Sequence, residues 1–301
     1  MEEKSFDDIL KRLSDLPSMP TIVQEMFNVM NMPNCSGKDV ARVLEKDQAL
    51  TVKILRMANS PFYGLSHRVD TVDRACTILG LNTLKDIALS VSMMNVFKSK
   101  SRAGTFDMVG MWKHGLGCAV AAKAVFELRY KSGDNVNVFV GGILHDIGKV
   151  ILDIYMPDEY KKIYELYGKD MSLVDAEMYI IGITHALIGR LLAKKWNFTK
   201  GMEEMIAFHH TPALAKVAQE QVAAVHIGNE IAKALSLGKS NELFVMPIDE
   251  GAWKIFFSEG SVLTPTLEVI LDEYTQIEEA FGLGDLEENR KGRPSGGSKG
   301  T

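Results

Sequence analysis

His145 and Asp146 stand side by side in the segment GGILHDIGKV, residues 141–150. An imidazole nitrogen and a carboxylate oxygen form a ligand set that zinc, iron or manganese accept. On a helix, neighbouring side chains point about 100° apart, so both reach one ion only at a helix end or bend. The glycines at positions 141, 142 and 148 permit such a bend and the close approach of another helix. The segment therefore raises the hypothesis of a metal site.

The second half of the chain holds six of the seven histidines: His114, His145, His185, His209, His210 and His226. Any one of them alone is most simply a core histidine bonded to a carbonyl, or an exposed side chain. Together they come singly from several helical segments, which is how helical bundles build metal sites in their cores. We expect these side chains to converge, and we expect His67, in the first half, to lie apart.

Apolar residues recur at helical spacing along nearly the whole chain, and the alternation of apolar and polar residues that is typical of strands is nowhere sustained. The segments Ser36–Asp39 and Ser172–Asp175 are typical of capped helix starts. The helices expected in the first half span about 6–13, 22–30, 47–58 and 82–97. Another is expected to begin at 36, and a short one is expected to end at 79. Those in the second half span about 106–130, 136–156, 158–167, 172–181, 185–195, 200–209, 214–236, 249–258 and 265–281. The sequence predicts an all-α fold, a multi-helix bundle in two lobes.

A polar stretch, SKSRAGT at 99–105, is the expected boundary between these lobes. We predict an N-terminal helical lobe over 1–99 and a second helical lobe over 105–238. Helices within 239–283 are expected to pack back onto this body. The Gly- and Ser-rich end, residues 284–301, has the composition of a disordered tail.

Composition excludes several classes of function. The 301 residues are 46% hydrophobic and 24% charged, with a net charge of −5, which argues against direct nucleic-acid binding. No stretch is long and apolar enough for a membrane span, and the first residues lack the apolar run of a secretory signal. The three cysteines form no CxxC pair and are typical of buried thiols in a reducing cytoplasm.

The order of motifs resembles a known superfamily. Trp112-x-His114, then HDIGK at 145–149, then His185 and the pair His209-His210, resembles the HD superfamily of metal-dependent phosphohydrolases. The first half contains LPSMP, EKDQALTVKILRMANSPFYG and ACTILGLNTLKDIAL, in that order. These elements resemble the HDOD family, the HD-related output domains of bacterial signalling. The resemblance implies an HD-domain-like second lobe.

By position, the resemblance implies these metal ligands: His114, His145, Asp146, His185, His209, His210 and, where the superfamily has a late aspartate, Asn229. An amide there removes one negative charge and leaves Asp146 as the only carboxylate of the inferred site. One ion (iron, manganese, zinc or nickel) is therefore favoured over two. Alternatively Glu230 or His226, on the same helix turn, could take the place of the missing carboxylate.

Lys149 has two open interpretations. The resemblance implies a lysine that contacts a phosphate of the ligand. Without the resemblance, Lys149 is interpreted as a solvated helix-end lysine favoured by the helix dipole. Relatives that cleave cyclic di-GMP have a Gly-Tyr-Pro motif after the histidine pair, whereas HHTPALAKVAQEQ follows here.

Three functions fit these observations. The leading hypothesis is a bacterial cytoplasmic signal-transduction module that binds a protein partner or a nucleotide ligand, with a retained or vestigial metal site. One alternative is an active metal-dependent phosphohydrolase on a nucleotide or phosphoester, with His145, Asp146 and Lys149 at its catalytic centre. The other is a nucleotide sensor that binds without cleaving. Asn229 and the missing Gly-Tyr-Pro favour binding over turnover.

Overall fold

A computed structural model describes residues 16–283 apart from 17, 64, 66, 98–106, 131–134, 169–170 and 258–262. Helices are the only regular elements within these ranges, where no strand occurs. The predicted all-α class is confirmed. The expected first helix at 6–13, the boundary stretch at 99–105 and the tail at 284–301 lie outside the described residues.

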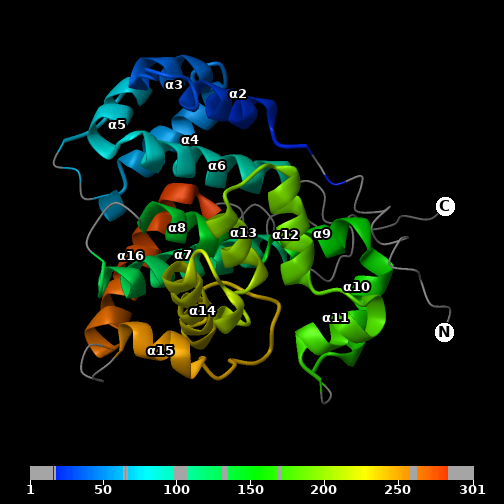
Figure 1. Ribbon diagram of the computed structural model, residues 1–301. Coiled ribbons are helices and arrows are strands. Elements are labelled where there is room, and N and C mark those ends of the chain that lie inside the picture. Colours follow the sequence, from blue (N-terminus) through cyan, green and yellow to red (C-terminus); the bar gives the residue numbers. More distant parts are fainter. Residues whose placement is uncertain are drawn as a thin grey trace, which may run out of the picture.

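The first lobe is a set of short helices at the top of Figure 1, coloured blue to cyan. They are α2 (Thr21–Met30), α3 (Gly37–Leu44), α4 (Gln48–Ala58), the 3-10 turn η1 (Pro61–Tyr63), α5 (Val72–Leu79) and α6 (Leu81–Phe97). The Ser36 side chain accepts the backbone N–H of Asp39, whose carboxylate accepts the N–H of Ser36. This reciprocal cap starts α3 as the sequence predicts, and Ser172 caps α11 through the N–H of Asp175.

The second lobe is built around α7 (Met108–Glu127), which packs against α8 and α14. The other helices are α8 (Asn135–Leu144), α9 (Ile147–Tyr155), α10 (Pro157–Leu166), α11 (Leu173–Ile181), α12 (His185–Lys195), α13 (Lys200–Ala207) and α14 (Gln219–Ala234). A Cβ added at Gly142 of α8 would lie 2.4 Å from the Cα of Ala119 on α7. Glycine thus allows the two backbones to approach closely, as the sequence suggests.

Three expected helices of this lobe have different bounds. The segment 136–156 is not one helix, because the chain breaks at residues 145–146 into α8 and α9. The helix expected over 200–209 ends at Ala207, so His209 and His210 lie in the turn after it. The helix expected from 214 begins at Gln219, after the 3-10 turn η2 (Pro212–Leu214). All three breaks border the histidine cluster.

Two C-terminal helices complete the described chain. α15 (Glu250–Phe256) packs on α14, and α16 (Leu263–Phe281) lies against α7 of the second lobe and α4 of the first. α6 borders the second lobe through α8. The division into an N-terminal lobe, an HD-like lobe and C-terminal helices stays a prediction.

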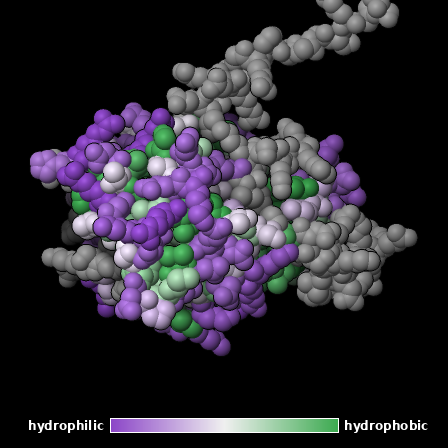
Figure 2. All heavy atoms as spheres, turned by 90° about the horizontal axis from the view of Figure 1, so that it is seen from above, coloured by the Kyte–Doolittle hydropathy of each residue, from purple (hydrophilic) through white to green (hydrophobic). Residues whose placement is uncertain are grey.

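Among the described helices, none alone is long and apolar enough to cross a membrane. α11 and α12 meet the length and composition test only as a pair, bent by 74° at their junction. Seen from above, the described surface is mainly hydrophilic, with hydrophobic atoms in small patches (Figure 2). Cys76 and Cys118 are buried as expected, while Cys35 is only half-buried.

Candidate metal centre

The break between α8 and α9 places His145 and Asp146 at the core of the second lobe. Both side chains are fully buried. A Cβ on Gly148, just inside α9, would lie 1.9 Å from the carbonyl oxygen of His185, the first residue of α12. The absence of a side chain at position 148 therefore lets α12 deliver His185 beside the turn. The helix end that two adjacent ligands require is present.

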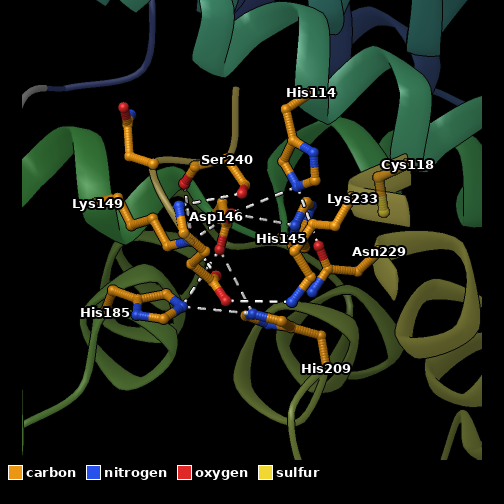
Figure 3. Close-up of polar contacts among 12 residues, drawn as sticks. His114, Cys118, His145, Asp146, Lys149, His185, His209, Asn229, Lys233 and Ser240 are labelled. Carbon is orange, nitrogen blue, oxygen red and sulfur yellow. Dashed lines mark hydrogen bonds and ion pairs between the residues drawn. The ribbon is translucent and has the colours of Figure 1, made fainter. Parts of the chain in front are cut away.

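Asp146 lies between two groups of imidazoles (Figure 3). Its Oδ2 is 3.2 Å from Nε2 of His145 and 3.8 Å from Nε2 of His114. Its Oδ1 is 3.2 Å from Nε2 of His185 and 3.5 Å from Nε2 of His209. The Nε2 of His210 completes the second group, 3.0 Å from that of His185. Five of the six histidines of the second half converge as predicted, whereas His226 does not, and the exposed His67 is not among them.

Hydrogen bonds on the far side of three rings orient their other nitrogens inward. Nδ1 of His145 lies 2.7 Å from the carbonyl of Gly142, and Nδ1 of His209 lies 2.8 Å from the carbonyl of Ile206. Nδ1 of His185 lies 2.8 Å from the carboxylate of Glu177. Each acceptor holds a proton on Nδ1, so in the neutral ring the Nε2 lone pair points to the centre. Ligating histidines have this arrangement.

The donor set fits a divalent ion. An ion with tetrahedral bonds of about 2.05 Å places its ligand atoms roughly 3.3 Å apart. The Nε2 atoms of His185 and His209 are 3.4 Å apart. Nε2 of His145 and Oδ1 of Asp146 are buried without a hydrogen-bond partner. A buried polar atom without a partner is costly, and each of these two belongs to one of the two groups that could hold a cation.

The protonation of each histidine in the centre depends on the buried carboxylates and histidines beside it. Burial lowers the pKa of His114 and of His209 to about 3 each. For His145, burial acts to lower the pKa, but the adjacent Asp146 carboxylate raises it well above its usual range. For His185, burial is likewise outweighed by Glu177 and Asp146, which raise the pKa to about 9. Protons on these two rings balance the buried carboxylates, and a bound cation would take over that role.

Asn229 lies at the edge of this centre, on α14. Its Oδ1 is 3.0 Å from Nε2 of His114, and its side chain is fully buried. The amide oxygen therefore faces one of the predicted metal ligands. Its Nδ2 donates to Glu230 over 3.3 Å.

Neither proposed substitute for the missing aspartate reaches the centre, so that alternative is wrong. His226 bonds the carbonyl of His209 through Nδ1, and its Nε2 accepts the N–H of Asp249. Glu230 forms an ion pair with Lys233 at 2.7 Å and accepts the N–H of Met246. Both side chains hold the surrounding backbone in place.

The solvated interpretation of Lys149 is also wrong. The side chain is fully buried, and its Nζ lies 2.7 Å from Oδ2 of Asp146 and 2.5 Å from Oε1 of Glu242. Burial acts to lower the pKa of Lys149, but these two carboxylates raise it. While Glu242 is in place, a lysine paired in this way has no free charge to offer a phosphate.

Sequence reasoning missed Glu177, Lys233 and Glu242. Glu177 also accepts the backbone N–H of His185 at 2.8 Å, so it fixes both the ring and the start of α12. Lys233 lies 3.1 Å from Glu242. The i, i+3 spacing of Glu230 and Lys233 on one helix could have indicated their pair. No sequence signal indicates the contacts of Glu242, whose partner Lys149 is 93 residues away.

An all-α protein with a buried histidine–aspartate centre at a helix break is the class that this fold and site define. The chain belongs to the HDOD family, whose model matches residues 16–212. A curated protein of Treponema pallidum (strain Nichols), itself uncharacterized, is 25% identical over 210 residues. That stretch is 67% of this chain but only 39% of the Treponema protein.

Solved structures share the fold. An HDOD domain protein of unknown function from Geobacter sulfurreducens has a TM-score of 0.72 and 24% identity, over 91% of this chain and 99% of that one. A protein of Shewanella amazonensis SB2B, provisionally called a phosphohydrolase, has a TM-score of 0.71 and 22% identity, over 91% and 97%. A protein of Marinobacter aquaeolei VT8, provisionally called a signal transduction protein, has a TM-score of 0.71 and 18% identity, over 93% and 65%. At these identities the likeness establishes the fold.

Proposed function

We propose that this chain is a signal-transduction output module of the bacterial cytoplasm that acts by binding, and that its second lobe holds a divalent metal without hydrolysing a substrate. Its partner is a protein of a signalling pathway or a nucleotide ligand. Membership of the HDOD family and the cysteines, which form no disulfide among the described residues, support this assignment. The Marinobacter relative's provisional name points the same way.

The pairing of Lys149 is the observation that carries the proposal. Hydrolysis of a phosphoester needs a cation free to steady the phosphate beside the metal. Lys149 instead forms buried ion pairs with Asp146 and Glu242. Side chains that could hold a metal thus lie together, while the lysine that would contact a substrate phosphate is occupied by the protein's own carboxylates.

The chain's residues would hold a metal in two ways. His185, His209 and His210, with one oxygen of Asp146, offer four ligand atoms, and His114 and His145 lie on the other oxygen. A bound ion supplies Lewis acidity, and here an ion bound by the first four atoms would also hold together the α8–α9 break, α12 and the turn after α13. We favour one ion, because Asn229 brings a neutral oxygen where a second carboxylate would offset a second dication.

Elemental analysis tests the metal. The protein is purified without chelators and without an affinity-tag metal, and we expect about one ion per chain. His145→Gln should lower the content at least tenfold, whereas the matched change His67→Gln, at an exposed histidine of the first lobe, should not. Metal-free wild-type protein would refute the proposed centre.

Turnover is measured on the same preparations with bis(p-nitrophenyl) phosphate and a cyclic dinucleotide. We expect no hydrolysis above that of His145→Gln. Hydrolysis that His145→Gln abolishes would instead support the alternative, a metal-dependent phosphohydrolase. One observation favours that alternative: the two ligand groups share Asp146, as a carboxylate shared between two ions does in two-metal sites.

A further inference from the structure

The segment 237–249 crosses the second lobe beside the metal centre without regular structure. It joins α14 to α15, and we call it the strap. Gly238 presses against α7, where an added Cβ would lie 2.1 Å from the backbone nitrogen of His114. The next residue, Lys239, donates its N–H to the carbonyl of Gly110 at 2.8 Å. One end of the strap is thus seated on the helix that supplies a metal ligand.

Further contacts hold the rest of the strap. Tyr164 donates its hydroxyl to the carbonyl of Asn241 at 3.0 Å, and Leu243 donates its N–H to the hydroxyl of Tyr167. Met246 donates its N–H to Glu230 at 2.7 Å. These are single hydrogen bonds to side chains, and no ladder or helix stabilises the segment.

Glu242 is the one strap residue whose charge enters the protein. Its carboxylate lies between two buried ammonium groups, Lys149 at 2.5 Å and Lys233 at 3.1 Å (the lysines are labelled in Figure 3). Each lysine has a second carboxylate partner, Asp146 or Glu230, on the helical framework. Asp146 lies in the two-residue break between α8 and α9 and Glu230 lies in α14, whereas Glu242 lies in a long irregular segment, so it is the carboxylate that can leave while the helices stay in place.

In the strap, a charged side chain is buried and the apolar side chains that follow it are exposed. Glu242 is only 6% exposed, while the four apolar residues that follow it face solvent. Their exposed fractions are 72% for Leu243, 50% for Phe244, 52% for Val245 and 44% for Met246. Leu237 and Ile248 pack on the core at the two ends of the strap. Between them, the exposed apolar side chains give little hydrophobic stabilisation, so the ion pairs of Glu242, a few hydrogen bonds and the ring contact of Phe244 with Tyr167 hold the strap in place.

A cavity of about 480 Å³ lies under the strap and is bordered by His114, Tyr164, Tyr167 and Lys233. Its size falls within the range of small-molecule sites. Lys233 and Glu242 line this cavity, whereas Lys149 lies behind Glu242. A phosphate group that took the place of the Glu242 carboxylate would meet both lysines, with more charge and more acceptor oxygens than a carboxylate. The aromatic walls would cover the body of the ligand.

We propose that the strap is an autoinhibitory element, in which Glu242 occupies the binding site for the phosphate of a small organic phosphate. Entry of that ligand displaces Glu242 and releases the strap. The inference rests on the proposed function, since it supplies the event that a binding module would signal. Because Gly238 touches His114, release of the strap also loosens one support of the metal centre.

Titration of inorganic phosphate into Glu242→Gln, by calorimetry at constant ionic strength, tests the inference. We expect this variant to bind phosphate at least tenfold more tightly than the wild type, because the amide competes poorly for two ammonium groups. The matched control is Glu250→Gln, an exposed charge loss that should leave the affinity unchanged. Glu242→Gln combined with Lys233→Met should lose the gain. A folded Glu242→Gln protein with wild-type affinity would overturn the proposal.

Loss of Glu242 leaves each of two buried lysines with one partner fewer, which can prevent the variant from folding. A second test therefore uses the unmodified chain. Chymotrypsin should cleave the strap after Leu243 or Phe244 several-fold faster in phosphate than in chloride of equal ionic strength. Equal cleavage rates would overturn the proposal even if the variant failed to fold. Metal content is measured on each sample. A metal-free protein that still binds phosphate through the lysines would refute the proposed metal function alone.

Discussion

At the scale of single residues, the centre depends on how one carboxylate is shared. Asp146 offers Oδ2 to the imidazoles of α7 and the helix break, and Oδ1 to those of α12 and the turn after α13. The buried amide of Asn229 borders the first group. Under the proposed function, a negative charge at residue 229 would favour metal binding and a neutral amide would disfavour a second ion.

Asn229→Asp should tighten metal binding about tenfold, because an anionic oxygen attracts a dication better than a neutral one. The measurement is affinity by calorimetry with zinc or manganese. The control is Asn82→Asp, the same charge change on the exposed face of α6. Equal affinity in Asn229→Asp and wild type would mean that residue 229 does not contact the ion.

Glu177→Gln should weaken metal binding about 10- to 100-fold, although Glu177 does not reach the centre. The amide is a poorer acceptor for Nδ1–H of His185, so the ring loses basicity and orientation. Glu203→Gln is the control, because Glu203 is also buried and paired, at 2.8 Å from Lys200, but lies on the outer side of α13. Equal losses in the two variants would show a general effect of buried charge.

At the scale of elements, the sequence predicted most helices and missed the breaks that make the site. Apolar residues occur throughout α8 and α9, so their periodicity predicts one continuous helix over 136–156. Nothing in this periodicity marks the break at residues 145–146, although two adjacent ligands for one ion require a helix end or bend there. The contacts of Lys149 were unpredictable for a different reason, since they depend on Glu242 in an irregular segment far along the chain.

The turn from α13 into α14 depends on Glu204. Its carboxylate accepts the N–H groups of Lys216, Val217 and Ala218, at 2.8 to 3.1 Å. Burial acts to raise the pKa of Glu204, but these three donors lower it overall. A folded-state pKa below the unfolded value gives stability that is present above the unfolded pKa and is lost as pH falls through the folded pKa.

Glu204→Gln should therefore lower the free energy of unfolding by about 2 kcal/mol at pH 7. The difference from wild type should shrink as pH falls below about 4, where the wild-type carboxylate takes up its proton. Urea unfolding at a series of pH values measures both effects. Glu250→Gln, at an exposed position, is the control and should show neither. A difference that stays constant with pH would contradict this account of the turn.

At the scale of the whole molecule, α16 connects the two lobes. It lies against α4 and α7, with Ile270 and Ile277 fully buried. Lys113 pairs with Glu278 at 2.7 Å, and Lys123 lies 3.3 Å from Glu273. Burial of each isoleucine contributes about 1.5–3 kcal/mol, so the helix stabilises the join by several kcal/mol.

A chain that ends at residue 257 should unfold at lower urea concentration than the full chain, and in two steps, because the lobes lose their shared helix. Unfolding followed by circular dichroism and by tryptophan fluorescence would separate the steps. A chain that ends at residue 283 retains α16 and should behave like the full protein. If both truncated chains unfolded alike, the two-lobe division would lose its support.

The strap has a consequence for how this architecture can diversify. The six histidine and aspartate side chains of the centre lie between residues 114 and 210, within the stretch 16–212 that matches the family. Lys233 and Glu242, which close the cavity, follow that stretch. The histidine–aspartate cluster and the residues that hold the strap are thus encoded in consecutive parts of the chain. Under the proposed function, exchange of the strap alone between relatives would change the ligand response while residues 114–210 and Asn229 stay the same.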